Sequence, residues 1–253
     1  MKTWVCFTLA ACALVASTGH AGVIVHGTRV VYPADRAEVV VRLENRGNRP
    51  ALVQTWVDTG DRQSTPATAR TPFALSPPIF RIEPQQQQAL RLRYVGEPLA
   101  ADRERLFWLN VLEVPPRSAD AGQNNQLELS FRTRLRVFLR PHALPYPVAA
   151  AAARLQWKLV EHSQGFALQA TNPTPYHVSL AKVTLLSAGR RFEKAPNQAA
   201  NDSLLLPAGD VKRFALPLLR HRPCGSATVE FTTVSDFGAR VPHSTDLALS
   251  CAG

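Results

Sequence analysis

Histidines, cysteines and short nucleophile or phosphate motifs are where catalytic chemistry would first be sought in this sequence. Beyond residue 21 the histidines are scattered, at His26, His142, His162, His177, His221 and His243. The chain has no G-x-S-x-G, H-E-x-x-H, C-x-x-C, Walker A or G-x-G-x-x-G run, so no catalytic or nucleotide site of a known type is indicated. We therefore expect a protein that is not an enzyme and that uses no metal or cofactor.

The first 21 residues have the three parts of a secretory signal peptide. Lys2 supplies a positive charge, residues 5–16 form an apolar run, and residues 19–21 (GHA) offer a small-residue cleavage site. A membrane anchor is the alternative, but the apolar run is shorter than the ~20 residues that span a bilayer. We expect residues 1–21 to be removed and the remaining chain to be exported.

Export would determine which of the four cysteines remain and whether they can form a disulfide. Cys6 and Cys12 leave with the signal peptide, so the mature chain keeps Cys224 and Cys251, both near its end. Exported compartments permit disulfides, and we expect these two to pair. Such a bridge would contribute roughly 3–4 kcal/mol in the chain-entropy model. Two free thiols are the alternative.

The chain is basic, with 29 Lys and Arg against 19 Asp and Glu and a formal net charge of +10. These charges are spread along alternating segments and are not packed into one tail or helix, so a nucleic-acid partner is not indicated. A solvated surface is the simpler interpretation, and a basic cleft that binds a partner is the second.

The elements that would position these charges are strands. Ala37, Val39, Val41 and Leu43 alternate with mostly polar neighbours and end at turn-forming residues 45–50, which is the period of a β-strand. No long segment shows a helical apolar repeat. Residues 148–153 could form a helical turn or a strand. Strands are expected at residues 37–44, 90–94, 106–114, 127–139, 155–160, 166–170, 178–185, 211–216, 227–234 and 245–251.

Short strands separated by turns predict an all-β protein built from immunoglobulin-like sandwiches. Each such sandwich needs roughly 100 residues, so the mature chain can form two. Two prolines, Pro141 and Pro145, bracket a short connector directly after a strand. We therefore expect an N-terminal domain at residues 22–141 and a C-terminal domain at residues 142–253.

One strand, residues 127–140, is unusually long, at about 46 Å for ~3.3 Å per residue. Its odd positions are apolar, apart from Thr133, and its even positions are mostly charged. It could be a long core strand with a bulge. Alternatively, part of its apolar face could remain uncovered as a template for a strand from another chain. The polar segment before it, residues 118–126, leaves its start without hairpin packing and favours the second interpretation.

Several motifs together resemble the PapD-type family of periplasmic pilus-assembly chaperones. They are GTRVVYP at 27–33, PPIFRIEP at 77–84, DRE at 102–104, LFWLN at 106–110, EVPP at 113–116 and RLRVFLRP at 134–141. The resemblance covers most of the mature chain. It implies two immunoglobulin-like domains in an L-shaped, boomerang arrangement, located in the periplasm, whose cleft holds a pilin that lacks its last strand. A structural pilin or adhesin is the alternative function.

By the same resemblance, Leu127, Leu129 and Phe131 plug the pilin groove, and Arg29 and Arg136 anchor the terminal carboxylate of the pilin. Arg136 replaces a lysine that is usual in the family, and arginine can bind a carboxylate through two hydrogen bonds. Arg136 is even-numbered whereas the plugs are odd-numbered, so they cannot share one flat face. A twist or bulge near Thr133, or a carboxylate reached from the far side, would reconcile them.

The resemblance also assigns architectural roles and partners. Glu104, Arg140 and Asp236 correspond to the charges that tie the two domains together, and the Ser76–Pro77 bond falls where the family can carry a cis proline. Pilin subunits and an outer-membrane usher are the implied partners. An exposed apolar strand also favours a self-capping dimer of the free protein.

Overall fold

A computed structural model describes residues 22–97, 102–114, 129–163, 165–194 and 204–249. In the first domain, strands β1, β3, β7 and β5 form one sheet and β2, β9, β8, β4 and β6 form the other. Their bounds are β1 Val23–Val25, β2 Arg29–Pro33, β3 Val39–Asn45, β4 Ala51–Asp58, β5 Phe73–Ser76, β6 Ile79–Ile82, β7 Gln87–Tyr94, β8 Arg105–Val114 and β9 Phe131–Arg140.

The second domain also consists of two sheets, one with the order β10-β11-β15 and one with the order β13-β12-β16-β17, with β14 beside β12. Its elements are η1 Val148–Ala150, η2 Ala152–Arg154, β10 Gln156–His162, β11 Gly165–Thr171, β12 Val178–Ser187, β13 Arg190–Glu193, β14 Leu205–Leu206, β15 Val211–Leu216, β16 Gly225–Val234 and β17 Arg240–Leu249. Residues 148–154 are thus two 3₁₀ turns and not a strand.

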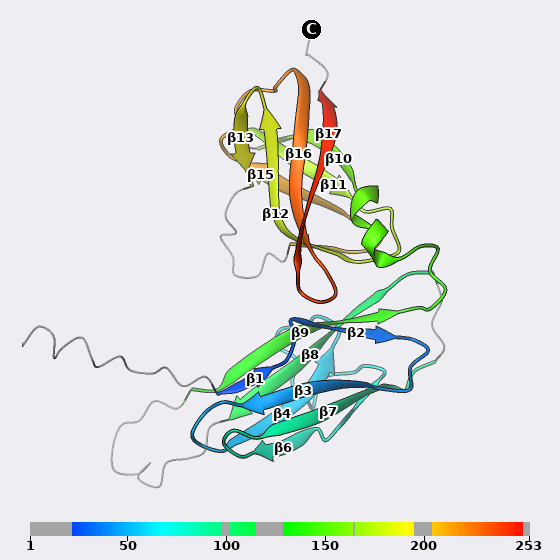
Figure 1. Ribbon diagram of the computed structural model, residues 1–253, viewed down its shortest axis with the longest axis vertical. Helices are drawn as coiled ribbons and strands as arrows, with labels where there is room; N and C mark the ends of the chain where they lie inside the picture. Colours follow the sequence, from blue (N-terminus) through cyan, green and yellow to red (C-terminus); the bar gives the residue numbers. More distant parts are fainter. Residues whose placement is uncertain (1–21, 98–101, 115–128, 164, 195–203, 250–253) are drawn as a thin grey trace, which may run out of the picture.

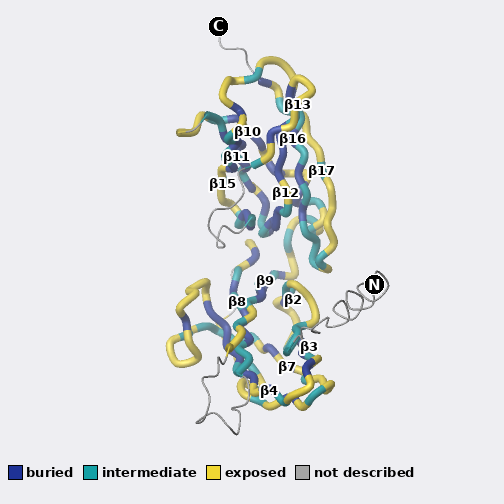
Figure 2. Tube along the Cα trace, turned by 90° about the vertical axis from the view of Figure 1, so that its left-hand side faces the viewer, coloured by how far each residue is buried: buried dark blue, intermediate teal, exposed yellow. Residues whose placement is uncertain are grey.

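Each sandwich has its own core, built by the alternation seen in the sequence. In the first domain, Val41 of β3 pairs with Leu90 of β7, and both are buried, as are Leu43 of β3 and Leu92 of β7. Figure 2 shows the buried stretches, in dark blue, in both domains. The prediction of an all-β protein with two sandwich domains is confirmed.

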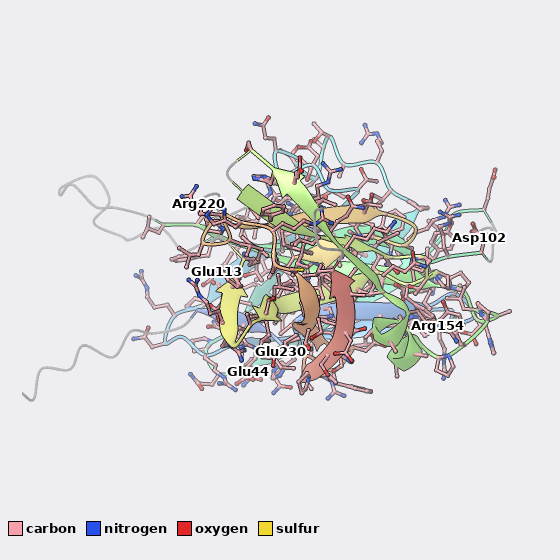
Figure 3. The ribbon with its side chains drawn as sticks, turned by 90° about the horizontal axis from the view of Figure 1, so that it is seen from above. Glu44, Asp102, Glu113, Arg154, Arg220 and Glu230 are labelled. Carbon is pink, nitrogen blue, oxygen red and sulfur yellow. The ribbon has the colours of Figure 1, made fainter. Side chains whose placement is uncertain are left out.

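The two domains are joined after β9 and lie at an angle, with β12, β16 and β17 of the second domain upright in Figure 1 and the strands of the first domain oblique. The tip of the β16–β17 hairpin reaches down toward β2 and β9 (Figure 1). Among the described residues, no helical segment has the length and hydropathy needed to span a membrane. Figure 3 labels charged residues on different sides of the molecule, among them Arg220, Asp102 and Glu44.

Strand β9 corresponds to the long strand expected from the sequence. Its antiparallel register with β8 is continuous from Arg105↔Leu139 to Glu113↔Phe131, so this strand contains no bulge. Its pairing with β2 is parallel and runs only from Arg29↔Arg136 to Pro33↔Arg140. Two parts of β9 therefore differ. The closed half, residues 136–140, lies between two strands, whereas the open half, residues 131–135, pairs with β8 alone among the residues that the structure describes.

Candidate binding site on β9 and the domain cleft

The parallel pairing of β2 with β9 places Arg29 and Arg136 directly side by side. The Nη1 atom of each donates to the hydroxyl of Ser179 on β12, at 3.3 Å in both cases. Arg29 Nη1 also donates to the carbonyl of Val234 on β16 at 2.9 Å. Since β12 and β16 belong to the second domain, this cation pair lies where the two domains meet.

Both cations of the pair are partly buried. Burial lowers the pKa of Arg29, and the charge of Asp236 only partly offsets this effect. Burial also lowers the pKa of Arg136, and the like charge of Arg29 lowers it further. Both guanidinium groups nevertheless remain charged, as arginine does in proteins. The Nε atom of Arg29 is buried and has no hydrogen-bond acceptor among the described residues.

A cavity of about 230 Å³ opens beside Arg29 and is lined mainly by apolar side chains, among them Phe138, Val178 and Val241. Arg29, Arg140 and the carboxylate of Asp236 also line this cavity, whereas Arg136 does not. A negatively charged group placed beside both Arg29 and Arg136 would meet two cations and the buried Nε–H donor of Arg29. Planar guanidinium groups bind carboxylates through paired, charge-assisted hydrogen bonds. The site therefore suits a carboxylate that carries an apolar neighbour.

Arg140, four residues along the same strand, has a different environment. It donates from Nε to Glu104 Oε1 at 2.5 Å and from Nη1 and Nη2 to the two carboxylate oxygens of Asp236 at 2.6 and 3.0 Å. Burial would lower the pKa of Arg140, but the hydrogen bonds and charges of Asp236 and Glu104 outweigh burial and raise it. The second oxygen of Glu104 accepts the backbone N–H of His177 at 2.8 Å.

This network, made of the residues that the sequence singled out, connects both domains. Glu104 precedes β8 and Arg140 ends β9, whereas His177 and Asp236 belong to the second domain. Glu104 is 3% exposed. Buried ion pairs of this kind fix orientation more reliably than they add net stability.

The exposure of the apolar side chains of β9 also differs between its closed and open halves. Val137 and Leu139 in the closed half are fully buried, and Leu135 is nearly so. Phe131 at the start of the open half is 62% exposed, and Leu129 just before the strand is 55% exposed. The third expected plug, Leu127, lies outside the described residues.

The continuous register answers the question of faces. Without a bulge, Phe131 and Arg136 point to opposite faces of β9. A ligand that contacts both must therefore run along the open edge of the strand, where the two faces meet. Of the explanations considered from the sequence, the continuous register excludes a bulge, and a twist or a carboxylate reached from the far side remains.

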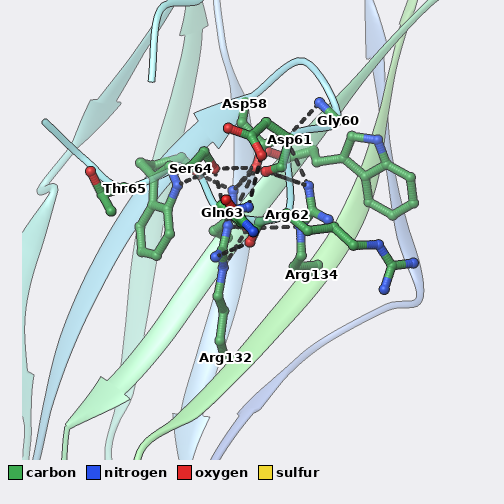
Figure 4. A network of polar contacts seen from close by, with 12 residues as sticks. Asp58, Gly60, Asp61, Arg62, Gln63, Ser64, Thr65, Arg132 and Arg134 are labelled. Carbon is green, nitrogen blue, oxygen red and sulfur yellow. Dashed lines mark hydrogen bonds and ion pairs between the residues drawn. The ribbon is translucent and has the colours of Figure 1, made fainter. Parts of the chain in front are cut away.

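Sequence reasoning missed a polar cluster on the even face of the open half, which we call the Asp58 network (Figure 4). Its members are Asp58, Ser64, Asn110, Arg132 and Arg134. The two arginines look like solvated surface cations in the sequence. Two tryptophans could have indicated this cluster, Trp56 on β4 and Trp108 on β8. Arginine side chains stack on such rings.

Two further expectations concern single features. The Ser76–Pro77 bond is cis. Cys224 forms a disulfide, and Cys251, its expected partner, lies outside the described residues. In the part of the chain that the structure describes, no group of three histidine, cysteine or acidic side chains could hold a metal.

Comparison with family models gives two adjoining matches. Residues 22–145 match the N-terminal domain of the PapD pili and flagellar-assembly chaperones, and residues 150–245 match the PapD C-terminal domain. The chain is 37% identical over 242 residues to the probable fimbrial chaperone YadV of Escherichia coli K12, covering 94% of each chain. It is 35% identical over 240 residues to the chaperone protein FimB/FhaD of Bordetella pertussis, covering 93% of this chain and 92% of that protein.

Solved structures agree. The crystal structure of the YadV chaperone matches with a TM-score of 0.74 and 35% identity, over 90% of this chain and all of that chain. The SafB chaperone of Salmonella enterica, solved in complex with the SafA pilin, matches with a TM-score of 0.70 and 29% identity, over 90% of this chain and 96% of that chain.

Proposed function

The chain belongs to the PapD family of pili and flagellar-assembly chaperones, and we propose that it captures pilin subunits through the open half of β9 and the Arg29–Arg136 pair. The SafB–SafA complex is a relative of this chain bound to a pilin. The observation that carries the proposal is the partial cover of β9 by β2, which ends at the cation pair.

Strand addition explains the open half. Among the described residues, only β8 pairs with residues 131–135, and Leu129 and Phe131 are exposed at the start of this segment. A pilin that lacks its last strand would accept this segment, with Leu127, Leu129 and Phe131 filling its groove. Burying one such large side chain stabilises the complex by roughly 1.5–3 kcal/mol.

The Arg29–Arg136 pair would bind the C-terminal end of the pilin chain. A pilin strand placed beside the open half, in line with β2 and parallel to β9, would run toward Arg29 and finish there. Its terminal carboxylate would accept hydrogen bonds from Arg29 and Arg136, and the unused Nε of Arg29 would gain an acceptor. The carboxylate would also relieve the repulsion between the two cations.

The Glu104–Arg140–Asp236 network would hold the domains at the angle that this site requires. Because Arg29 and Arg136 both contact Ser179 of the second domain, a change in that angle would alter the carboxylate site.

The family relationship supports three further proposals. Residues 1–21 would act as a cleaved signal peptide that delivers the chain to the periplasm, and an outer-membrane usher would receive the pilin from the chaperone. The exposed face of β9 would allow the free chaperone to cap itself as a dimer.

Co-expression with a cognate pilin tests the anchor. We expect Arg29→Ala and Arg136→Ala each to lower the amount of soluble pilin in the periplasm at least tenfold, the effect of about 1.4 kcal/mol. Arg42→Ala, an exposed cation on β3 in the other sheet, is the matched control and should have no effect. Full recovery of soluble pilin with both anchor variants would refute the anchor.

A further inference from the structure

The open half of β9 has a structural problem that its pairing does not solve. Among the described residues, only β8 pairs with residues 131–135. A strand with one neighbour and an exposed apolar end is prone to fray or to twist out of the sheet. Donating such a segment would require it to be straightened at the moment of binding, and ordering of this kind weakens association.

The even-numbered side chains of the same segment are held by an unusually dense set of contacts. Arg134 donates from Nη2 to both carboxylate oxygens of Asp58, at 2.8 and 2.9 Å, and from Nε to Asn110 Oδ1 at 3.0 Å. Its guanidinium carbon lies 4.9 Å from the ring centre of Trp108. Arg134 is therefore fixed by a carboxylate, an amide and an aromatic face at once.

Arg132, two residues earlier, is fixed in a similar manner. Its Nε and Nη2 atoms donate to Asn110 Oδ1 at 3.0 and 2.8 Å, and its Nη1 donates to the carbonyl of Arg62 at 2.8 Å. Its guanidinium carbon lies 4.5 Å from the ring centre of Trp56. The contact with Arg62 joins β9 to the segment that follows β4.

The centre of the network is rigid in its own right. Asp58 is 2% exposed and Asn110 is fully buried. Asp58 accepts hydrogen bonds from the Asn110 side-chain amide at 2.7 Å, the Ser64 hydroxyl at 2.8 Å and the Gly60 backbone N–H at 2.6 Å. Figure 4 shows Asp58 of β4, and Gly60 and Ser64 of the segment after β4, gathered close to the two arginines.

We infer that the Asp58 network is a positioning site that keeps the open half of β9 extended for capture of a pilin, an inference that rests on the function proposed above. The network acts from the even face, whereas Leu129 and Phe131 belong to the odd face, so it leaves both the open edge and the apolar side chains clear. The open half of β9 is thus held by polar contacts on its even face, and its odd face and open edge stay available to a pilin.

The first test uses the free chaperone and needs no pilin. In Arg134→Gln, amide hydrogen exchange at residues 131–135 should accelerate at least tenfold, while exchange at residues 137–139 changes less than twofold. An acceleration of the same size in both halves would show a general structural role and would overturn the inference. So would unchanged exchange in both halves.

The second test measures the rate of pilin capture. Arg134→Gln should slow capture at least tenfold, and Arg42→Gln, the exposed β3 cation, should not alter it. Faster exchange with an unchanged capture rate would overturn the positioning role. If Arg134→Gln does not fold, Arg132→Gln, which leaves the Asp58–Arg134 pair in place, is measured by the same two criteria.

Donation of the β9 segment and its positioning by the Asp58 network can be tested separately. If Leu129→Glu captures pilin normally, donation of this strand is wrong, whatever the exchange rates are. If Leu129→Glu abolishes capture and Arg134→Gln leaves capture unchanged, donation stands and the positioning role is wrong.

Discussion

The closed and open halves of β9 share one alternating sequence pattern but have different environments. In the closed half, Val137 and Leu139 are fully buried and two strands flank the backbone. In the open half, Phe131 is 62% exposed and β8 is the one neighbouring strand among the described residues. The difference arises from the length of β2, which covers five residues of β9 and no more. A strand can therefore be part core and part binding surface without any change in its own pattern.

The largest effect is expected at the end of the closed half, where Arg140 joins the domains. Arg140→Ala would leave Glu104 and Asp236 without their cation, and breaking a buried pair in this way costs about 3–5 kcal/mol. Urea denaturation would measure the loss of unfolding free energy. A loss below about 1 kcal/mol would mean that the network is not needed to hold the domains together.

A core truncation in the closed half should come next. Leu139 is fully buried, so Leu139→Ala should lower the free energy of unfolding by about 2–5 kcal/mol, from lost burial and the cavity left behind. Thermal and urea unfolding would both detect this change. A cost similar to that of a surface substitution would contradict the division of β9 into two halves.

The Asp58 network makes the stability of the open half depend on pH. Burial would raise the pKa of Asp58, but hydrogen bonds from Asn110, Ser64 and Gly60 and the charge of Arg134 outweigh burial and lower it. A lowered pKa contributes stability above the unfolded value of about 3.9 and loses it as the pH falls through the folded value. The stability advantage of wild type over Asp58→Asn should therefore shrink between pH 7 and pH 3. A constant difference in unfolding free energy would contradict this assignment.

The smallest effect on stability is expected from Phe131→Ala. Because the side chain is mostly exposed, its removal should change the free energy of unfolding by no more than about 0.5 kcal/mol. The same experiment on Leu139→Ala provides the contrast. A cost above about 2 kcal/mol for Phe131→Ala would place Phe131 in the core and remove the distinction between the halves.

Much of this architecture could be predicted because alternation determines which residues of a strand share a face. The all-β fold follows from the period of segments such as residues 37–44, and the motif resemblance led to Arg29, Arg136 and Arg140. Several strands were not separately predicted, among them β4 and β2. In β4, residues 55–58 are buried on both faces, so the alternation is lost, and β2 has just five residues.

The positions of the arginines on β9 show what the sequence could not supply. Arg132, Arg134, Arg136 and Arg140 all look like one polar face, yet their partners come from distant segments. Arg140 meets Asp236 across the domain boundary, Arg134 meets Asp58 on β4, and Arg136 lies beside Arg29 on β2. Which cation is neutralised depends on these long-range contacts, and pattern alone does not reveal them.

The most direct test of strand donation is capture of a cognate pilin by Leu129→Glu, with the thermal stability of the variant measured in parallel. Leu129 is 55% exposed in the free chain, so a glutamate should be tolerated there but excluded from an apolar pilin groove. We expect a chaperone that unfolds at the wild-type temperature and no longer co-purifies with the pilin. A folded variant that still captures pilin at the wild-type level would contradict donation of this strand.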